Sequence, residues 1–206
     1  MGEKFRYEEF TWPEIRDAAA QNRAAVVPVG TVEQHGPHLP LATDLLAALE
    51  IARLAVKRIP GEAVLLPAVP YGSSAHQMDF PGAVSVESET VVRYLTGLGI
   101  SLARHGFGKI LLVNVDRANA PLLDVAAREV TRRTESLCAA VMCWNLVPPP
   151  LAEELRDPAG IAAHAGELES SVMLYLRGDL VRMQEAEPEA GGEPLSPTLV
   201  FDDWPS

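Results

Sequence analysis

The sequence contains little cysteine and no long apolar run. Its two cysteines, Cys138 and Cys143, lie in one apolar stretch, at a spacing that fits neither a disulfide framework nor a four-cysteine zinc site. The first residues, MGEKFRYEEFTW, lack both the apolar core of a signal peptide and the Ser/Thr of a myristoylation signal. No apolar run reaches the roughly 18 residues typical of a transmembrane helix. We therefore expect reduced thiols in a soluble cytoplasmic protein that does not bind membranes.

Basic residues are scarce relative to acidic ones. Lysine and arginine total 17 against 28 aspartates and glutamates, which gives a formal net charge of -11. No basic cluster has the density of a nucleic-acid-binding surface, so a nucleic-acid partner is not expected. With 48% hydrophobic and 22% charged residues, the composition is that of an ordinary globular protein.

Short apolar runs alternate with longer amphipathic segments along the chain. Strands are expected at 24–30, 63–72, 109–115 and 137–147, and helices at 11–21, 44–59, 88–106, 120–133 and 166–176. This alternation is typical of an α/β fold in which helices flank a mainly parallel sheet. The three prolines at 148–150 are expected to form a rigid break.

The C-terminal segment differs in composition from the rest. Residues 185–206 are acidic and rich in proline and glycine, without a helical period. We therefore divide the chain into a domain at 1–184 and an extended tail at 185–206. The tail is either a free end or a segment that docks on a neighbouring surface through the aromatics of LVFDDW.

The stretch PVGTVEQHGPHLPLATD follows the first predicted strand, at the sheet edge where ligands of α/β proteins bind. Glu33 and His35 are two residues apart, so an extended segment points both side chains the same way. Asp44, at the start of the next helix, can return to the same point. Carboxylates with imidazole suit Zn²⁺, Mn²⁺ or Fe²⁺. The spacing alone is equally consistent with a surface turn in which Asp44 caps the helix.

Four segments together resemble the ordered motifs of the creatininase (creatinine amidohydrolase) family. They are PVGTVEQHGPHLPLATD, PYGSSAHQMDFPG, HGFGKILLVN and HAGELESS, and the resemblance extends from about Trp12 to Val181. It implies a three-layer α/β/α domain, usually in a homo-oligomer, that binds two divalent metals and hydrolyses a C–N amide bond, often in a ring.

The same resemblance implies roles for individual residues. Glu33, His35 and Asp44 would be metal ligands, with Asp44 bridging two ions. His164 would carry the proton and Glu167 would be a carboxylate of the site. Such a site would polarise an amide carbonyl while the imidazole protonates the leaving nitrogen.

Two further residues are candidates for substrate binding. His76 lies in the segment that resembles the family's substrate-side loop, and Trp144 follows a predicted strand. The alternatives are a surface histidine and a core tryptophan, respectively. We expect His38 to have a structural role in its turn.

The resemblance breaks at the segment after the third strand. The family usually has NGHGGN there, with a metal-binding histidine, whereas this chain has NVDRAN at 114–119. Asp116 takes the histidine's position and is itself a suitable metal ligand. Arg117 replaces a glycine, and if it pointed inward it would repel metal or pair with a carboxylate. Ala83, Ala163 and Ser170 also depart from the family pattern.

Two hypotheses follow. The first is a metal-dependent amidohydrolase that acts on a small, linear or cyclic amide, with one or two divalent metals held by Glu33, His35, Asp44 and Asp116. The second is a catalytically silent subunit of the same fold that binds a partner, such as an active relative. The direction of the Arg117 side chain discriminates between them, since an ion pair with a ligand favours the silent form.

Overall fold

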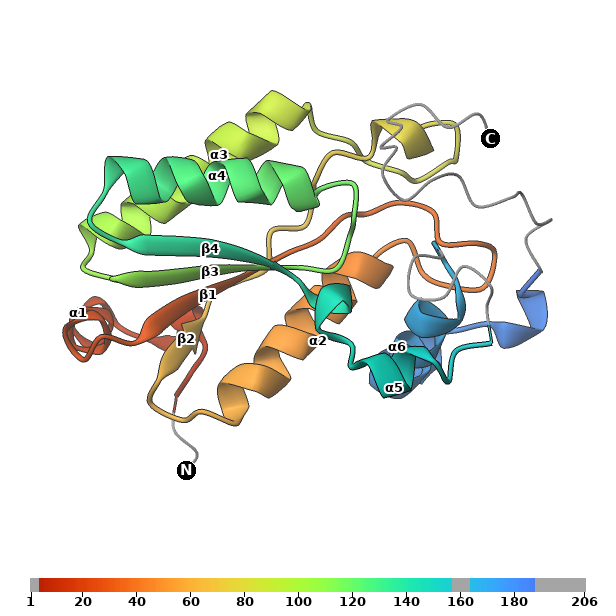
Figure 1. Ribbon diagram of the computed structural model, residues 1–206, viewed down its shortest axis with the longest axis horizontal. Coiled ribbons are helices and arrows are strands. Elements are labelled where there is room, and N and C mark those ends of the chain that lie inside the picture. The colour runs from red at the N-terminus through yellow and green to blue at the C-terminus, as the bar shows by residue number, and fades with distance from the viewer. Residues whose placement is uncertain (1–3, 157–163, 188–206) are drawn as a thin grey trace.

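A parallel four-stranded sheet forms the centre of the computed structural model, which describes residues 4–156 and 164–187 (Figure 1). In chain order the strands are β1 (Ala24–Val29), β2 (Ala63–Leu65), β3 (Lys109–Asn114) and β4 (Leu137–Met142). Their order in the sheet is β2-β1-β3-β4. The chain therefore leaves β1 in one direction and later adds β3 on its other side, which makes the β1–β3 boundary the topological switch point.

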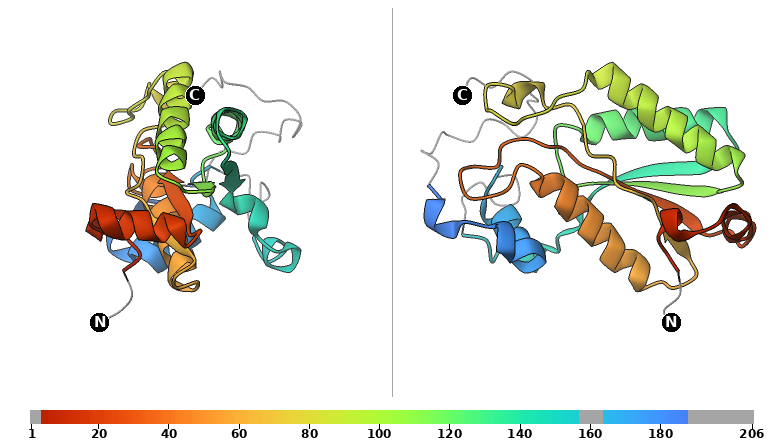
Figure 2. Two further views of the ribbon diagram at one scale, coloured as in Figure 1. Left: turned by 90° about the vertical axis from the view of Figure 1, so that its left-hand side faces the viewer. Right: turned by 180° about the vertical axis from the view of Figure 1, so that it is seen from behind.

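Helices cover both faces of this sheet (Figures 1 and 2). They are α1 (Trp12–Ala20), α2 (Thr43–Lys57), α3 (Ser88–Arg104), α4 (Ala120–Arg133), α5 (Pro149–Ala152) and α6 (Glu167–Arg177). Short 3-10 turns occupy Tyr7–Glu9, Ala75–Gln77, Cys143–Leu146, Gly178–Leu180 and Met183–Glu185. Figure 1 shows α3 and α4 on one side of the sheet and α2 on the other.

The alternation of side chains along β1 produces these layers. Val27 and Val29 enter a buried cluster with residues of α1, α3 and α4, whereas Val26 enters a second cluster with residues of α2 and α6. Successive side chains of a strand point to opposite faces, so one apolar strand supplies two cores. The expected three-layer α/β/α architecture is confirmed.

Most predicted element boundaries agree with the structure, but three differ. Strand β4 ends at Met142 instead of continuing to 147, because Cys143–Leu146 form a 3-10 turn. The three prolines at 148–150 do not end the chain's regular structure, because Pro149 and Pro150 begin the short helix α5. Proline suits a first helical turn, where its fixed φ is helical and no amide hydrogen is needed. Strand β2 covers only Ala63–Leu65 of the expected segment. Pro67 and Pro70 have no backbone N–H to donate to a neighbouring strand, so they prevent a longer strand.

Within the described ranges, no helix is both long and apolar enough to cross a membrane. Most of the predicted tail, 188–206, lies outside the described residues. The division into a domain and a tail therefore stays a prediction.

Gly30 fixes how closely β1 approaches α2. A Cβ atom at this position would lie 2.4 Å from the Leu45 Cα and 2.6 Å from its backbone nitrogen. The Gly30 amide also donates to the Val69 carbonyl at 3.0 Å. Only glycine permits this contact between the end of the strand and the first turn of the helix.

We therefore expect Gly30→Ala to destabilise the protein. The added methyl group meets backbone rather than a mobile side chain, and such overpacking costs about 1–3 kcal/mol. Gly97→Ala is the matched control, because a Cβ at Gly97 meets nothing within 4 Å, and replacing an exposed helical glycine by alanine stabilises by about 1 kcal/mol. Urea unfolding of both variants measures the difference; equal effects would show that the contact at Gly30 is unimportant.

Candidate metal centre

The segment after β1 buries two of the predicted ligands. Glu33 and His35 are 0% and 1% exposed, and Val32 between β1 and Glu33 forms an antiparallel bridge with Val84. This extended backbone points both side chains to the same side, as the sequence predicts. The Nδ1 of His35 lies 3.2 Å from the Glu33 carbonyl oxygen. A proton on Nδ1 therefore leaves Nε2 as the ligand atom.

Asp44 lies in the first turn of α2 and is 2% exposed. The Thr31 hydroxyl donates to its Oδ2 at 2.6 Å, and the same oxygen lies 3.3 Å from the His35 Nε2. The close packing at Gly30 brings this turn against the end of β1. Strand β1 and helix α2 thus place three buried polar side chains together.

Helix α6 and the turn before it add two residues from far along the chain. The Glu169 Oε2 lies 3.9 Å from the His35 Nε2 and accepts a hydrogen bond from the Ala165 amide at 2.7 Å. The His164 Nε2 lies 3.4 Å from the Glu33 Oε1, and its side chain is 38% exposed. His164 is therefore the imidazole of this cluster that solvent reaches most readily.

Asp116 joins the cluster from the end of β3. A ligand oxygen of Asp116 lies within 4.8 Å of ligand oxygens of Glu33 and Asp44. Its carboxylate accepts hydrogen bonds from the Ala118 amide at 2.9 Å and the Asn119 amide at 3.1 Å. The Asn119 side-chain amide also donates to it. These bonds orient the carboxylate. Two of the three go to Oδ2 and one goes to Oδ1, so Oδ1 is the oxygen that keeps a further lone pair for a cation.

Buried Asn119 connects Asp116 to the loop that follows β2. Its Nδ2 donates to the Ser73 carbonyl at 2.8 Å, and its Oδ1 accepts from the Ser73 amide at 2.7 Å. A Cβ at Gly72 would lie 2.6 Å from the Asn119 Oδ1. The loop that follows β2 is therefore held against the cluster.

Six side chains form three overlapping groups with the spacing of metal ligands. These are Glu33, His35 and His164; His35, Asp44 and Glu169; and Glu33, Asp44 and Asp116. Among the described residues, both carboxylate oxygens of Glu33 and the Nε2 of His35 are buried without a hydrogen-bond partner. A buried carboxylate that accepts no hydrogen bond is costly, even beside the His164 imidazole at 3.4 Å, and a coordinated cation lowers that cost. The residues present therefore fit one or two divalent metals.

Charge interactions within the cluster shift several pKa values. Burial disfavours the charged form of His35, but Asp44 and then Glu169 and Glu33 outweigh it and raise its pKa to about 9. Burial, followed by the charges of Asp44 and Glu33, raises the pKa of Asp116 to about 7. Burial alone would raise the pKa of Asp44, yet the adjacent His35 holds it below its ordinary value. The carboxylates of the cluster thus stabilise the positively charged form of His35.

Glu167 occupies a different place from Glu169. Its Oε2 accepts a hydrogen bond from the Arg156 amide at 2.5 Å, and it belongs to none of the candidate ligand groups found among the described residues. Residues two positions apart on a helix lie about 200° apart around its axis, so only one of the pair can point at the cluster. The catalytic role expected of Glu167 stays a prediction.

Glu169 is the residue that the sequence interpretation missed. A signal for it is present, because Glu169, Val172, Met173 and Leu176 repeat at the spacing of one helix face. Met173 is fully buried and Glu169 is 8% exposed. An acidic residue on the apolar face of a helix indicates a buried partner.

The remaining predicted residues lie around the cluster. His76 is half-buried in the 3-10 turn Ala75–Gln77, and the neighbouring Gln77 accepts a hydrogen bond from Gln34 at 2.9 Å. Trp144 is buried in the hydrophobic cluster that includes Leu168 of α6. Contact of His76 or Trp144 with substrate stays a prediction.

Arg117 and His38 are also placed by the structure. Arg117 is exposed, and the ion pairs described for Glu33 and His35 are with His164, Asp44 and Glu169. The His38 Nε2 lies 2.8 Å from the Ser170 hydroxyl, so it ties the first motif to α6. This agrees with the structural role expected of His38.

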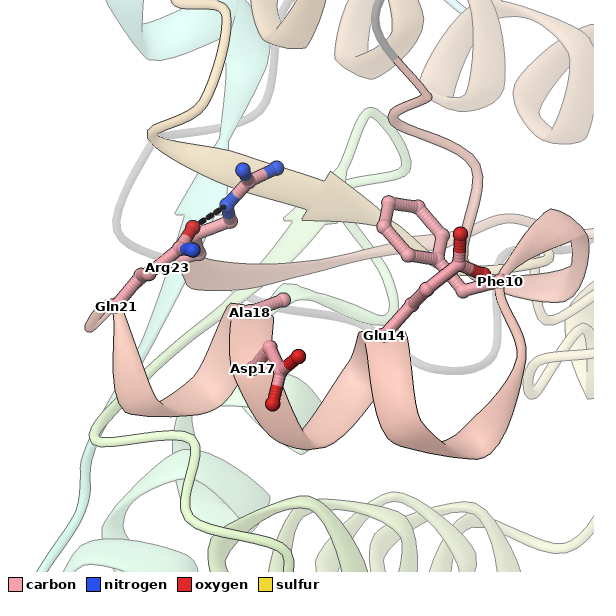
Figure 3. Close-up of a pocket in the computed structure, with 6 residues that line it drawn as sticks. All are labelled: Phe10, Glu14, Asp17, Ala18, Gln21 and Arg23. Carbon is pink, nitrogen blue, oxygen red and sulfur yellow. Dashed lines mark hydrogen bonds between the residues drawn. The ribbon is translucent and has the colours of Figure 1, made fainter.

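A shallow surface groove lies elsewhere, beside α1 (Figure 3). It is lined by Phe10, Glu14, Asp17, Ala18, Gln21 and Arg23. Helix α1 ends at Ala20 and β1 begins at Ala24, so the groove adjoins the amino end of the strand. Glu33 and His35 follow the carboxyl end, which separates the groove from the candidate metal centre.

The raised pKa of Asp116 predicts a pH dependence of stability in the metal-free protein. Between its ordinary pKa of 3.8 and about 7, the folded state retains a proton that the unfolded state releases. The free energy of unfolding should therefore fall as pH rises through this window. The free energy of unfolding of Asp116→Asn should fall less over the same pH window. Urea unfolding in a chelator near pH 4 and near pH 7 compares the two; parallel curves would contradict the shift.

Comparison with known proteins agrees with this architecture. The sequence model of the creatininase family (creatinine amidohydrolase) matches residues 8–204. Creatinine amidohydrolase of Pseudomonas putida is 29% identical over 189 residues, covering 84% of this chain and 72% of that protein. The mycofactocin precursor peptide peptidase of Mycolicibacterium smegmatis is 35% identical over 164 residues, covering 78% of this chain. This chain spans only 60% of that peptidase, less than two thirds of its length.

Solved creatininase structures have the same fold. A creatininase mutant of the Zn–Zn type superposes with a TM-score of 0.84 at 25% identity, covering 98% of this chain and 83% of that one. A manganese creatininase gives a TM-score of 0.81 at 26% identity with the same coverage. The family match over nearly the whole chain and the shared fold lead to one conclusion: this chain belongs to the creatininase family.

Proposed function

We propose that this protein is a metal-dependent amidohydrolase that hydrolyses a C–N amide bond in a small linear or cyclic substrate. The observation that carries the proposal is a set of buried atoms that make no hydrogen bond among the described residues, the two Glu33 oxygens and the His35 Nε2, within a cluster whose contacts to them are ion pairs. A silent protein has no use for such a costly arrangement. The names of the relatives, an amidohydrolase and a peptide peptidase, support a C–N bond as the target.

Glu33, His35, Asp44, Asp116 and Glu169 would hold the metal. Asp44 would be shared between two positions, because it belongs both to the group with Asp116 and to the group with Glu169. A bound divalent cation supplies Lewis acidity, which polarises a carbonyl oxygen and lowers the pKa of water. Zn²⁺, Mn²⁺ and Fe²⁺ all suit such mixed donors. The creatininases compared above are of Zn–Zn and Mn types.

His164 would move the proton. It is partly exposed and lies 3.4 Å from Glu33, so it reaches both the ligand cluster and an incoming substrate. An imidazole can accept a proton and pass it to the leaving nitrogen, as a general acid–base catalyst does. Contacts from His76 and Trp144 would orient the substrate. We expect a cytoplasmic homo-oligomer.

A second candidate is the silent subunit, which would pair with an active relative. One observation favours it: the Asp116 carboxylate already accepts amide hydrogen bonds from Ala118 and Asn119, as a turn-capping aspartate does. The metal content of protein purified without added metal distinguishes the two candidates. One or two equivalents per chain support the hydrolase, and no metal even after incubation with Zn²⁺ and Mn²⁺ supports the silent subunit.

The histidine roles predict different losses. His35→Ala should lose metal, because it removes a buried ligand nitrogen. His164→Ala should keep metal but lose about 100-fold or more in turnover of an amide identified by screening, the usual contribution of a general acid. His105→Ala, at the exposed end of α3, is the control. Elemental analysis measures the metal content of each variant, and kinetics measure its turnover. Full turnover by both His35→Ala and His164→Ala would exclude their proposed roles as metal ligand and proton carrier.

Glu169 and Glu167 form a matched pair on one helix. Glu169→Gln should weaken metal binding by about 10- to 100-fold, because it replaces a carboxylate beside His35 with a neutral amide. Glu167→Gln should retain metal, since Glu167 belongs to no ligand group of the described residues. Titration with Zn²⁺ followed by calorimetry measures both affinities. The reverse result would restore Glu167 as the carboxylate of the site.

A further inference from the structure

Ala165, between His164 and helix α6, has an unusual backbone conformation. Its φ is +53°, in the left-handed region, and among the described residues Asn22, at +60°, is the other non-glycine residue with a positive φ. Asparagine enters this region readily because its side chain bonds locally, whereas the Cβ of alanine crowds the following carbonyl oxygen. Such a conformation persists only where the surrounding structure imposes it. The neighbours of Ala165 therefore hold it in place.

Contacts on two sides fix this turn. The Ala165 amide donates to the Glu169 Oε2 at 2.7 Å, four residues further along the chain, and that carboxylate is buried. The Ala165 Cβ lies 3.7 Å from the position that a Cβ at Gly36 would take, so the turn packs on the loop that follows β1. The buried hydrogen bond between His38 and Ser170 joins the same loop to α6. The turn is thus held between α6 and this loop.

His164 immediately precedes the turn, and its imidazole lies in the ligand cluster. Its ring centroid is 4.5 Å from that of His35, and its Nε2 lies 3.4 Å from the Glu33 Oε1. A change of φ at Ala165 from +53° to an ordinary helical value would rotate the preceding chain by roughly 110° about the N–Cα bond. Helix α6 follows that bond and could stay in place, whereas the His164 imidazole would leave Glu33.

We propose that Ala165 is a positioning residue whose left-handed backbone holds the His164 imidazole beside Glu33 for proton transfer. The proposal rests on the proton-carrying role of His164 in the function proposed above. Ala165 acts through His164, and the requirement is for a backbone conformation rather than for a side chain. Residues that admit a positive φ can therefore replace Ala165, and residues that exclude it cannot.

Three substitutions separate backbone conformation from side-chain size. Ala165→Gly and Ala165→Asn both admit a positive φ, whereas Ala165→Val introduces a β-branched side chain of a size comparable to Asn that strongly disfavours it. In the Zn²⁺-loaded chain, Ala165→Val should lose about 100-fold or more in kcat, the contribution of a general acid, with metal content and KM close to those of the wild type. Ala165→Gly and Ala165→Asn should retain kcat.

Asn22→Gly is the matched control, because Asn22 also has a positive φ but lies between α1 and β1, at the amino end of the strand. It should leave turnover unchanged.

Nuclear magnetic resonance of the metal-free chain measures the placement of His164 without activity. The ring protons of His35 and His164 should give a nuclear Overhauser effect in the wild type, in Ala165→Gly and in Ala165→Asn. Ala165→Val should lose this effect while its circular dichroism spectrum stays that of the wild type.

The possible results have distinct meanings. A folded Ala165→Val that keeps the ring contact and kcat overturns the proposal. Loss of the ring contact in Ala165→Asn as well as in Ala165→Val also overturns it, because side-chain size then accounts for both. If Ala165→Val does not fold, loss of the contact in folded Ala165→Gly and Ala165→Asn overturns it. A wild type that binds no metal and hydrolyses no amide removes the proposed function, whereas loss of the contact in Ala165→Val alone still supports the placement of His164 by Ala165.

Discussion

Buried negative charge is the constraint on which this structure depends. Four carboxylates, those of Glu33, Asp44, Asp116 and Glu169, lie in overlapping ligand groups at one edge of the sheet. Removing such charges from water costs several kcal/mol each unless opposite charge compensates them. Protonation of His35 and Asp116 supplies part of that compensation, as their raised pKa values show. A divalent cation would supply more, in a form that can also act on a substrate.

The fold provides rigid supports for this concentration of charge. Strands β1 and β3 lie side by side, with Val29 opposite Asn114, so the segments that follow them meet at the switch point. The close contact at Gly30 sets the first turn of α2 against β1. The His38–Ser170 hydrogen bond ties α6 to the same loop. Candidate ligands carried by separate parts of the chain are thereby held close together.

The departures from the family pattern at 114–119 have a structural explanation. Val115 is 1% exposed and packs in the hydrophobic cluster with Val113 and Trp144, so its side chain fills core rather than the ligand cluster. Arg117 is exposed. Asp116 is the residue of this segment that belongs to a candidate ligand group among the described residues. The altered segment therefore changes the chemistry of one ligand position and leaves the rest of the cluster in place.

The sequence by itself determined the layers, because apolar runs and helical periods encode which segments bury which faces. It also determined Glu33, His35 and Asp44 as a group, since they lie close together along the chain. Tertiary structure alone decided the partners that come from afar. Whether Glu167 or Glu169 faces the cluster depends on the rotation of α6, which packing sets. The link from Asn119 to Ser73 likewise joins residues 46 positions apart, and only the folded sheet brings them into contact.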